Sequence, residues 1–405
     1  MAKKSKATIA DVARLAGVST ATAGRVLGRY GYAKEETREQ VMQAARKLGY
    51  RTNALARSLI TGKTRTIGVV AGDIQNPFYA SILRGIADVV ESRDFGLLIV
   101  NSDERLDKEI RAVNLLMEKQ VDGLIVSPCD TLRAHHLRDL QAAGLPLVLL
   151  DRGVAGMAVD RVTVDNIAAS ERAVAALISA GHTRIGLVSE LLEEQEGGLN
   201  GFIRRGLAGE VLSTDTLYPS WQRLLGYLRA HRQAELEVAP SLICRVGAYS
   251  AGAAQAAVKA LFENADRPSA VFATDGTMSE GVIGAVSAAG LAVPRELSLV
   301  CFDDLEWMSF LSPGITTMAQ PRLAMGEAAA TMLLERIEGY DAEGRAVVKR
   351  GPGTSSGVRS RPRTMRGKAV SASSLTRQRC AGPVVQPVSP TGFSRRSQPG
   401  RDPCR

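Results

Sequence analysis

Four residues near the start of the chain carry side chains that suit contact with a DNA duplex. The sequence TATAGR supplies hydroxyl groups at Thr20 and Thr22, a methyl group at Ala21 and a guanidinium at Arg25. Arg25 can donate two hydrogen bonds to a guanine, Thr20 can contact a base or a phosphate, and Ala21 can pack on a thymine methyl. If one helix face exposes these residues, that face can distinguish base sequences.

The apolar residues around this stretch predict the helices that would hold it. A first helix carries an apolar stripe, the chain breaks at Gly17, and Ser19 can cap the start of a second helix. The two stripes consist of Ile9, Val12, Ala13 and Ala16, and of Ala23, Val26 and Leu27. This is the form of a helix-turn-helix unit, whose second helix can lie in a major groove, although an ordinary helical hairpin shares the pattern. A third helix over about residues 35–48 would complete the domain through Val41, Ala44, Ala45 and Leu48.

Composition places the chain among intracellular globular proteins. Its 405 residues predict two or three domains, and a hydrophobic content of 45% supports a substantial core. No apolar run approaches the length of a membrane span, and the opening MAKKSK is not followed by the apolar region of an export signal. The five cysteines are scattered without C-x-x-C spacing, which favours a reducing cytoplasm and argues against a disulfide framework or a zinc site.

The formal net charge of +9 is distributed unevenly along the chain. Residues 1–65 carry +10, residues 66–344 carry −14, and residues 345–405 carry +13. A basic head on an acidic body suits a head that binds a polyanion while the body stays away from it. Solvated charge without a partner is the alternative, and it suits the tail better than a head that also carries a helix-turn-helix pattern.

From residue 65 onward, strands alternate with helices. We expect strands over 66–71, 97–100, 123–127, 145–151, 161–165 and 184–189, and three more in the runs SLICRV, SAVFATD and SLVCFDD. Such alternation predicts doubly wound parallel sheets, and a body of about 280 residues favours two of them with a cleft between. Ligands would then bind beyond the carboxyl ends of the strands.

A series of motifs makes the prediction more specific. In chain order they include TIADVARLAGVSTAT, LGYRTNALARSL, NPFYASILRGI, VDGLIVSP, GHTRIGLV and VPRELSLVCFDD. Over residues 8–340 the chain thereby resembles a LacI/GalR-family transcriptional repressor. The resemblance implies an α/β protein: an N-terminal three-helix helix-turn-helix domain and a periplasmic-binding-protein-like, doubly wound body of two subdomains. We expect the DNA-binding domain at 1–52, a hinge helix at 53–64, the effector-binding and dimerisation body at 65–344, and a basic tail at 345–405.

The resemblance assigns DNA-contacting roles to the second helix and to the hinge. Residues early in the second helix would reach base edges, and the hinge helix would fold on DNA where two copies meet. Leu59 would insert into the minor groove as a wedge, with Arg57 and Lys63 on phosphates. The full predicted set is Thr20, Ala21, Thr22, Arg25, Asn53, Ala56, Arg57, Leu59 and Lys63. A solvated linker is the alternative interpretation of the hinge segment.

The resemblance also places an effector site in the body. Rings and an amide at the mouth, and charged groups at strand ends, would hold a small molecule. The predicted residues are Asn76, Phe78, Tyr79, Asp151, Arg152, Arg223, Tyr249 and Asp275. The arginine is placed by the family pattern R-x-x-G-[FY], which Arg223, Gly226 and Tyr227 satisfy, whereas Gly198 stands where Asn200-Gly201-Phe202 would need an arginine. This choice implies an insertion over about 190–220, either a lid or a surface excursion.

These acceptors and donors suit vicinal hydroxyl groups, so a sugar is the first expectation for the effector and a nucleoside or purine the second. The alternative is a vestigial cleft, with control exerted by a partner protein. Common catalytic signatures are missing from the sequence (G-x-G-x-x-G, the P-loop, G-x-S-x-G and H-E-x-x-H), and the four histidines have no ligand or triad spacing. We therefore expect no enzymatic activity, no metal and no cofactor.

The resemblance predicts a homodimer, or a tetramer, on a palindromic operator in the cytoplasm, associated with the nucleoid. The tail is rich in Arg, Ser, Pro and Gly without periodicity, which predicts disorder. Two origins are open: an out-of-frame continuation of the gene, or a basic arm that adds nonspecific DNA affinity. Loss of the family's last strand would leave a sheet edge open in the second subdomain.

Overall fold

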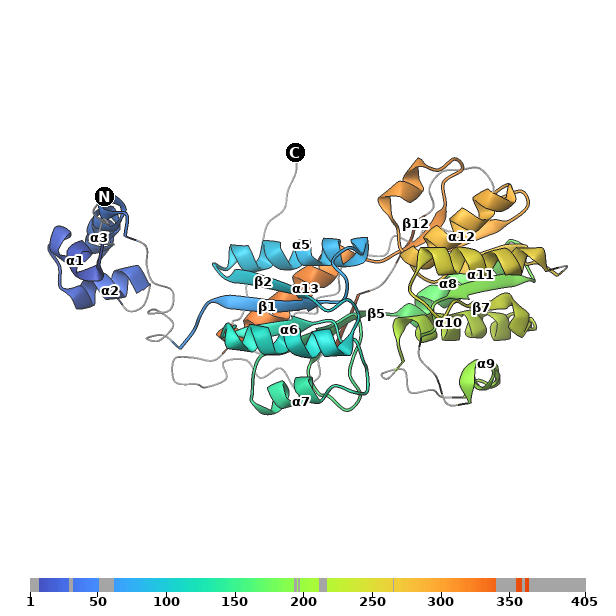
Figure 1. Ribbon diagram of the computed structural model, residues 1–405, viewed down its shortest axis with the longest axis horizontal. Helices are drawn as coiled ribbons and strands as arrows, with labels where there is room; N and C mark the ends of the chain where they lie inside the picture. The colour runs from blue at the N-terminus through green and yellow to red at the C-terminus, as the bar shows by residue number, and fades with distance from the viewer. Residues whose placement is uncertain are drawn as a thin grey trace, which may run out of the picture. The chain divides into compact units, whose positions relative to one another are not determined.

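The computed structural model describes residues 7–28, 32–50, 62–192, 195, 197–210, 217–264 and 266–339, and the backbone of 355–358 and 361–363. Its elements form a helical head and two sheet-containing lobes (Figure 1). The hinge residues 53–61 lie outside the described residues.

The head consists of three helices around one small core. They are α1 (Ile9–Leu15), α2 (Thr20–Gly28) and α3 (Glu35–Leu48). The buried side chains are Val12, Ala13, Ala23, Val26, Leu27, Val41, Ala44 and Ala45. Most of the predicted core is therefore confirmed. Ile9 and Leu48 are exceptions at 36% and 38% exposed, because each lies at the end of its helix, where the neighbouring helices no longer cover it.

The first lobe is a six-stranded sheet covered by helices on both faces. Its strand order is β11-β5-β4-β3-β1-β2, and every neighbouring pair is parallel. The strands are β1 (Thr66–Ala71), β2 (Gly96–Asn101), β3 (Gly123–Val126), β4 (Leu147–Leu150), β5 (Asp160–Val164) and β11 (Ser355–Val358). The helices are α5 (Pro77–Ser92), α6 (Leu106–Glu118), α7 (His135–Ala142) and α13 (Arg322–Glu338).

The second lobe repeats this arrangement with the order β12-β10-β9-β8-β6-β7, in which only β12 is antiparallel to its neighbour among the described pairs. The strands are β6 (Ile185–Ser189), β7 (Ile243–Arg245), β8 (Ala270–Ala273), β9 (Ser298–Phe302), β10 (Thr316–Ala319) and β12 (Arg361–Arg363). The α-helices are α8 (Asn166–Ser179), α9 (Gly198–Ala208), α10 (Pro219–Gln233), α11 (Ala251–Glu263) and α12 (Gly276–Ala289). Two short 3₁₀ helices, η2 (Pro240–Leu242) and η3 (Glu306–Phe310), complete it.

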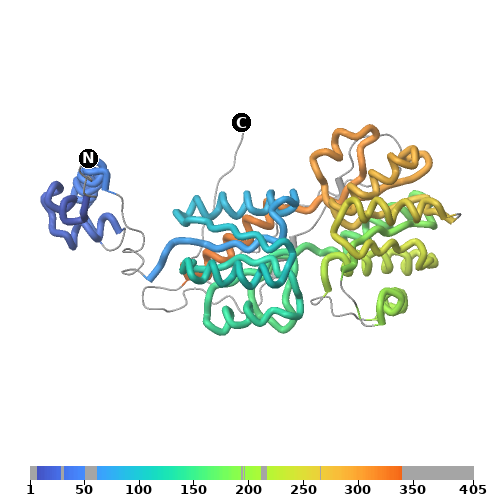
Figure 2. Tube along the Cα trace, in the orientation of Figure 1, coloured from blue at the N-terminus to red at the C-terminus, as the bar shows by residue number. Residues whose placement is uncertain are grey.

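The chain passes between the two lobes more than once: it leaves the first lobe after β5 and returns after β10 into α13 (Figure 2). Further along, β11 pairs with the first sheet and β12 with the second. The order 2-1-3-4-5 of the first sheet matches 7-6-8-9-10 of the second, so each strand has a topological equivalent in the other lobe. All nine predicted strands are present within a few residues of their expected bounds, whereas β10, in the run ITTMAQ, was not predicted as a strand.

Glycines allow the covering helices to approach one another closely. A Cβ atom on Gly226 of α10 would lie 2.4 Å from the carbonyl oxygen of Ile167 in α8. A Cβ on Gly326 of α13 would lie 2.0 Å from the carbonyl oxygen of Ile82 in α5. These contacts are with backbone atoms, which cannot rotate away. In the R-x-x-G-Y motif, the glycine therefore serves helix packing, and Tyr227 is buried with its hydroxyl donating to the carbonyl of Ile185 at 2.7 Å.

Two segments differ from or refine the sequence predictions. The stretch 345–405 was expected to be disordered, but its residues 355–358 and 361–363 extend the two sheets as edge strands β11 and β12, because each finds an open edge with which to pair. The expectation is wrong for those residues; the rest of the tail lies outside the described residues. Within 190–220, α9 packs on the second lobe through Phe202 and Ile203, so the described part of this segment is an added helix of the core.

Candidate functional site

The second helix of the head exposes most of the residues expected to read DNA. Ser19 caps it, because its Oγ accepts a hydrogen bond from the Thr22 amide at 3.1 Å. Thr20, Ala21 and Arg25 are exposed, whereas Thr22 is half-buried with its hydroxyl 2.9 Å from Ser19 Oγ. The exposed face therefore offers one hydroxyl, one methyl and one guanidinium, while Thr22 contributes to the cap.

The remaining predicted DNA contacts fall at the hinge. Asn53, Ala56, Arg57 and Leu59 lie outside the described residues. Lys63 is described, and its Nζ donates to the carbonyl oxygen of Ile337, near the end of α13, at 3.4 Å. The residues expected to contact DNA from the hinge therefore stay predictions.

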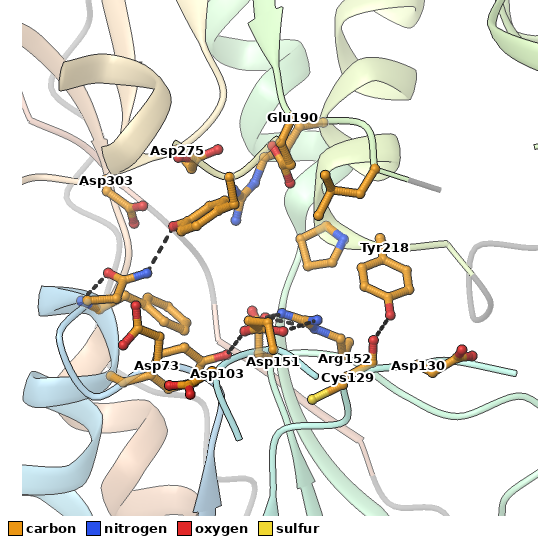
Figure 3. A pocket seen from close by; sticks show the side chains of 18 of the residues that line it. Asp73, Asp103, Cys129, Asp130, Asp151, Arg152, Glu190, Tyr218, Asp275 and Asp303 are labelled. Atoms are coloured by element: carbon orange, nitrogen blue, oxygen red, sulfur yellow. Dashed lines mark hydrogen bonds and ion pairs between the residues drawn. The ribbon is translucent and has the colours of Figure 1, made fainter. Parts of the chain in front are cut away.

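The second candidate site is a cavity of about 460 Å³ lined by residues from both lobes (Figure 3). This volume is in the range of sites for small molecules. All eight side chains predicted for an effector site line it, namely Asn76, Phe78, Tyr79, Asp151, Arg152, Arg223, Tyr249 and Asp275. These eight residues lie up to about two hundred positions apart in the sequence. Within each lobe the parallel strands end at the same edge of the sheet, which brings the residues that follow them together, and α10 adds Arg223.

Sequence reasoning missed further lining residues that have the same topological position. Each follows the carboxyl end of a strand or the turn after it. They include Asp73 after β1, Asp103 and Glu104 after β2, Cys129 and Asp130 after β3, Glu190 after β6, Asp303 after β9 and Gln320 after β10. The rule that identified Asp151 and Asp275 could have found these residues if it had been applied to every strand.

On the first lobe, Arg152 is held between two carboxylates. Its Nη1 donates to Glu104 Oε2 at 2.9 Å, and its Nε donates to Asp151 Oδ2 at 3.3 Å. The guanidinium carbon also lies 4.9 Å from the centre of the Tyr218 ring. Burial raises the pKa of Asp151, and the positive charges of Arg152 and Arg223 oppose that shift. The first-lobe side of the cavity is therefore polar, and Arg152 pairs there with both Glu104 and Asp151.

On the second lobe, Arg223 is buried and fixed by neutral groups. Its Nε donates to Asn166 Oδ1 at 2.9 Å and its Nη1 donates to the carbonyl of Thr274 at 2.7 Å. Its guanidinium carbon lies 4.0 Å from the centre of the Phe302 ring. The arginine is therefore oriented before any ligand arrives, which lowers the entropic cost of binding.

The carboxyl groups of the second lobe surround this arginine from strand ends. Asp275 caps α12, with Oδ1 accepting from the Met278 amide at 2.9 Å. Burial raises the pKa of Asp275 well above its usual value, and the neighbouring Glu190 carboxyl raises it further. Asp303 accepts from Gln320 Nε2 at 2.7 Å. Asp275 thus serves as a helix cap and also lines the cavity.

Comparison with known proteins shows to which family the chain belongs. Residues 8–53 match the model for bacterial regulatory proteins of the lacI family, and 64–206 match the periplasmic binding proteins and sugar binding domain of the LacI family. Residues 174–356 match a periplasmic binding protein-like domain. Catabolite control protein A of Priestia megaterium is 34% identical over 80% of this chain and 91% of its own length. The chain belongs to the LacI family.

Other relatives agree with this membership. The repressor PurR of Aliivibrio fischeri is 32% identical over 84% of this LacI-family chain and 94% of its own length. The structure of the transcriptional regulator CelR in complex with cellobiose superposes with a TM-score of 0.61 at 25% identity, covering 88% of this chain and 98% of the other. The protein is therefore a DNA-binding transcriptional regulator with a helix-turn-helix head and a two-lobed body. Among the described residues, no helix is long and apolar enough to cross a membrane.

Two aspartates of the LacI-family body have strained backbones at equivalent places in the two lobes. Asp151 follows β4 with φ of 69°, and Asp303 follows β9 with φ of 74°. Residues other than glycine seldom adopt this left-handed conformation, which costs on the order of 1–3 kcal/mol and is concentrated at functional sites. The strain places both carboxyl groups along the cavity, one from each sheet.

Two neutral hydrogen bonds join the lobes across the cavity. Asn76 Nδ2 donates to the Tyr249 hydroxyl at 2.9 Å, while Asn76 Oδ1 caps α5. The Tyr218 hydroxyl donates to the carbonyl oxygen of Cys129. Tyr218 comes from the end of the 190–220 segment, so that segment contributes to the cavity wall as well as to the core.

Proposed function

We propose that this protein is a repressor whose affinity for an operator is controlled by a sugar-like molecule bound in the cavity between its lobes. The observation that carries the proposal is the set of eight predicted effector residues, all of which line one cavity of about 460 Å³. The Phe78 and Tyr249 rings can pack on the faces of a sugar ring, while Arg223 and Asp151 can hydrogen-bond its hydroxyl groups.

Relatives support a carbohydrate first and a nucleobase second. The solved structure of CelR is that of its complex with cellobiose. Other LacI-family relatives are named as a ribose operon repressor and as the repressor PurR. The cavity combines hydrogen-bond donors and acceptors at many positions with the rings of Phe78, Tyr218 and Tyr249, and this combination suits the hydroxyl groups and the ring faces of a sugar. We infer that a ligand closing on both lobes shifts the equilibrium between two arrangements of the body, and so changes operator affinity.

The DNA partner is a palindromic operator bound by a homodimer in the cytoplasm, at the nucleoid. Each head would place Arg25 and Thr20 of α2 in the major groove of one half-site. Leu59 of the hinge would insert at the centre of the operator, and Lys63 would contact phosphate. The protein would act through binding alone, without catalytic activity.

The test of this function uses the full-length chain. Genomic DNA fragments are selected on the protein, and binding of the enriched site is then compared with binding of random duplex, with and without each member of a sugar and nucleoside panel. We expect a preferred palindromic site and one compound that both raises the melting temperature and changes operator affinity. Failure to prefer any site over random duplex, under every condition, would refute the proposal.

Two variants separate base reading from phosphate contact. Arg25→Ala should lower affinity for the selected operator by about tenfold or more and leave affinity for random duplex nearly unchanged, since a bidentate guanine contact is worth roughly 1–3 kcal/mol. Lys63→Ala should weaken both duplexes alike. Fluorescence anisotropy titrations measure both effects. Equal losses on the two duplexes for Arg25→Ala would show that this arginine contacts only phosphate.

A further inference from the structure

The carboxyl groups on the two sides of the cavity differ in how their charge is balanced. On the first lobe, four carboxylates pair with basic side chains, and a fifth, Asp73, is half-exposed. The pairs are Asp103 with Lys108, Glu104 with Arg152, Asp130 with Arg133 and Asp151 with Arg152. Three cations therefore pair with four of the five carboxylates on this side, so the two sides differ in how their carboxyl groups are paired.

The second lobe presents three carboxyl groups without such partners. Within the described parts of the chain, Glu190, Asp275 and Asp303 form no ion pair. The one cation lining this side of the cavity, Arg223, directs Nε and Nη1 to neutral oxygens. Figure 3 shows Asp275 and Glu190 close to each other at the upper wall. This wall therefore holds three carboxyl groups beside one described guanidinium, and two of the carboxyls, Asp275 and Glu190, interact directly with each other.

Two buried oxygen atoms on the same wall have no hydrogen-bond donor as long as Asp275 and Glu190 are both ionised. They are Asp275 Oδ2 and Gln320 Oε1, whose residues are only 5% and 7% exposed. The second polar atom of each side chain fixes its orientation, because Asp275 Oδ1 accepts from the Met278 amide and Gln320 Nε2 donates to Asp303 Oδ1. A buried acceptor without a donor is costly. Both atoms belong to residues that line the cavity, so a ligand can supply the missing donors.

We propose that the effector is an amino sugar, whose protonated amine lies between Asp275 and Glu190 while a neighbouring hydroxyl donates to Gln320 Oε1. This inference rests on the proposed function of the cavity and names the class of its ligand. An ammonium group has three donors and no acceptor, which matches a wall made of acceptors. A neutral hexose brings no positive charge to these two neighbouring carboxyl groups, whereas an ammonium group can replace the proton that burial holds on Asp275. A metal ion fits less well, because the described residues contain no group of three or more ligating side chains arranged to hold one.

The test compares sugars that differ only at one substituent. Isothermal titration calorimetry of the full-length protein at pH 7 uses D-glucosamine against D-glucose and D-galactosamine against D-galactose. We expect at least one amino sugar to bind tenfold or more tightly than its neutral partner. Asp275→Asn and Glu190→Gln should each reduce that preference to within about threefold, because charge-assisted hydrogen bonds are roughly twice as strong as neutral ones.

Asp165→Asn is the matched control. Asp165 caps α8 as Asp275 caps α12, with its Oδ1 accepting from the Ala168 amide at 2.9 Å, but it is exposed and away from the cavity lining. Asparagine caps helices about as well as aspartate, so each substitution removes a charge and keeps the cap. The control should keep the full preference for the amino sugar. Urea denaturation of all three variants confirms that they are folded.

The pH dependence gives an independent readout. The amine replaces a proton on Asp275, whose carboxyl is faced by Glu190, Asp303, Tyr249 and Arg223 from four separate elements. Affinity for the amino sugar should therefore rise as the pH increases above the usual range of an aspartate, while that for the neutral sugar stays flat. Equal or tighter binding of the neutral sugars, no binding of any of the four, or an unchanged preference in Asp275→Asn and Glu190→Gln would overturn the inference. Operator selectivity persisting in those cases would leave the proposed regulator intact.

Discussion

The crossing of α8 and α10 gives a sharp prediction that links helix packing to the cavity. In Gly226→Ala, the new Cβ would lie 2.4 Å from the carbonyl oxygen of Ile167 and 2.9 Å from the amide nitrogen of Glu171. Cβ atoms essentially never come closer than 3.0 Å to such atoms, so the helices must separate by at least about 0.6 Å. The hydrogen bond from Arg223 to Asn166 spans this crossing at 2.9 Å, and it would lengthen to about 3.5 Å, the limit of such a bond.

The expected loss of stability follows from this geometry. Overpacking against backbone costs about 1–3 kcal/mol. With a denaturation slope of roughly 3 kcal/mol/M, the urea midpoint should fall by about 0.3–1 M. Fluorescence of Trp221 reports the transition, because this residue is fully buried on α10 itself.

Gly252→Ala is the control for the glycine substitution itself. Gly252 lies in α11, is exposed, and its Cβ would find its nearest neighbour, Ser250 Oγ, at 3.9 Å. Alanine at such a position raises stability by about 0.4–1 kcal/mol, since it restricts the unfolded chain. If Gly226→Ala unfolds at the same urea concentration as the unsubstituted protein, or at a higher one as expected for the control, the close contact between α8 and α10 is refuted.

Two further substitutions test the cap of the recognition helix and the buried carboxyl group. Ser19→Ala should lower the free energy of unfolding of the head by about 0.5–2 kcal/mol, because the Thr22 amide loses its acceptor; circular dichroism melts measure this, and an unchanged melt would argue against the cap. Asp275→Asn should stabilise the ligand-free protein at pH 7. The folded-state pKa of Asp275 lies well above the value of 3.8 for an unperturbed aspartate, so its ionisation weakens the fold as pH rises through that interval. The gain in the urea midpoint should shrink toward zero as pH falls to 3.8, and a gain that is larger at low pH would contradict this reasoning.

Local patterns were sufficient for the elements and for part of the site. The apolar stripes of the head, the cap at Ser19 and the buried strands follow from spacing alone, because a helix and a strand bury side chains at different periods. The family motif R-x-x-G-[FY] assigned the cavity arginine to Arg223 and not to the segment of α9 around Gly198, which has no arginine at the required position. The structure places Arg223 in the lining of the cavity. In the same motif, the reason for the glycine became visible only at the contact with α8.

Other features depend on contacts between distant segments. The edge strands β11 and β12 lie in a stretch whose composition predicts disorder, and they form because each sheet offers an open edge. Ile9 has the spacing of a core residue but no neighbouring helix to cover it. Sequence reasoning named Asp151 and Asp275 but omitted Glu190, Asp303 and Gln320, whose importance comes from facing the same cavity from different strands.

The sequence by itself thus determined the order of the elements, the family and most of the side chains that line the cavity, since these depend on periodicity and on motifs a few residues long. Only the tertiary structure decided which carboxyl groups are paired and which are not. Charge balance in a cavity depends on distances between strand ends that lie far apart in the sequence, and no local pattern records those distances.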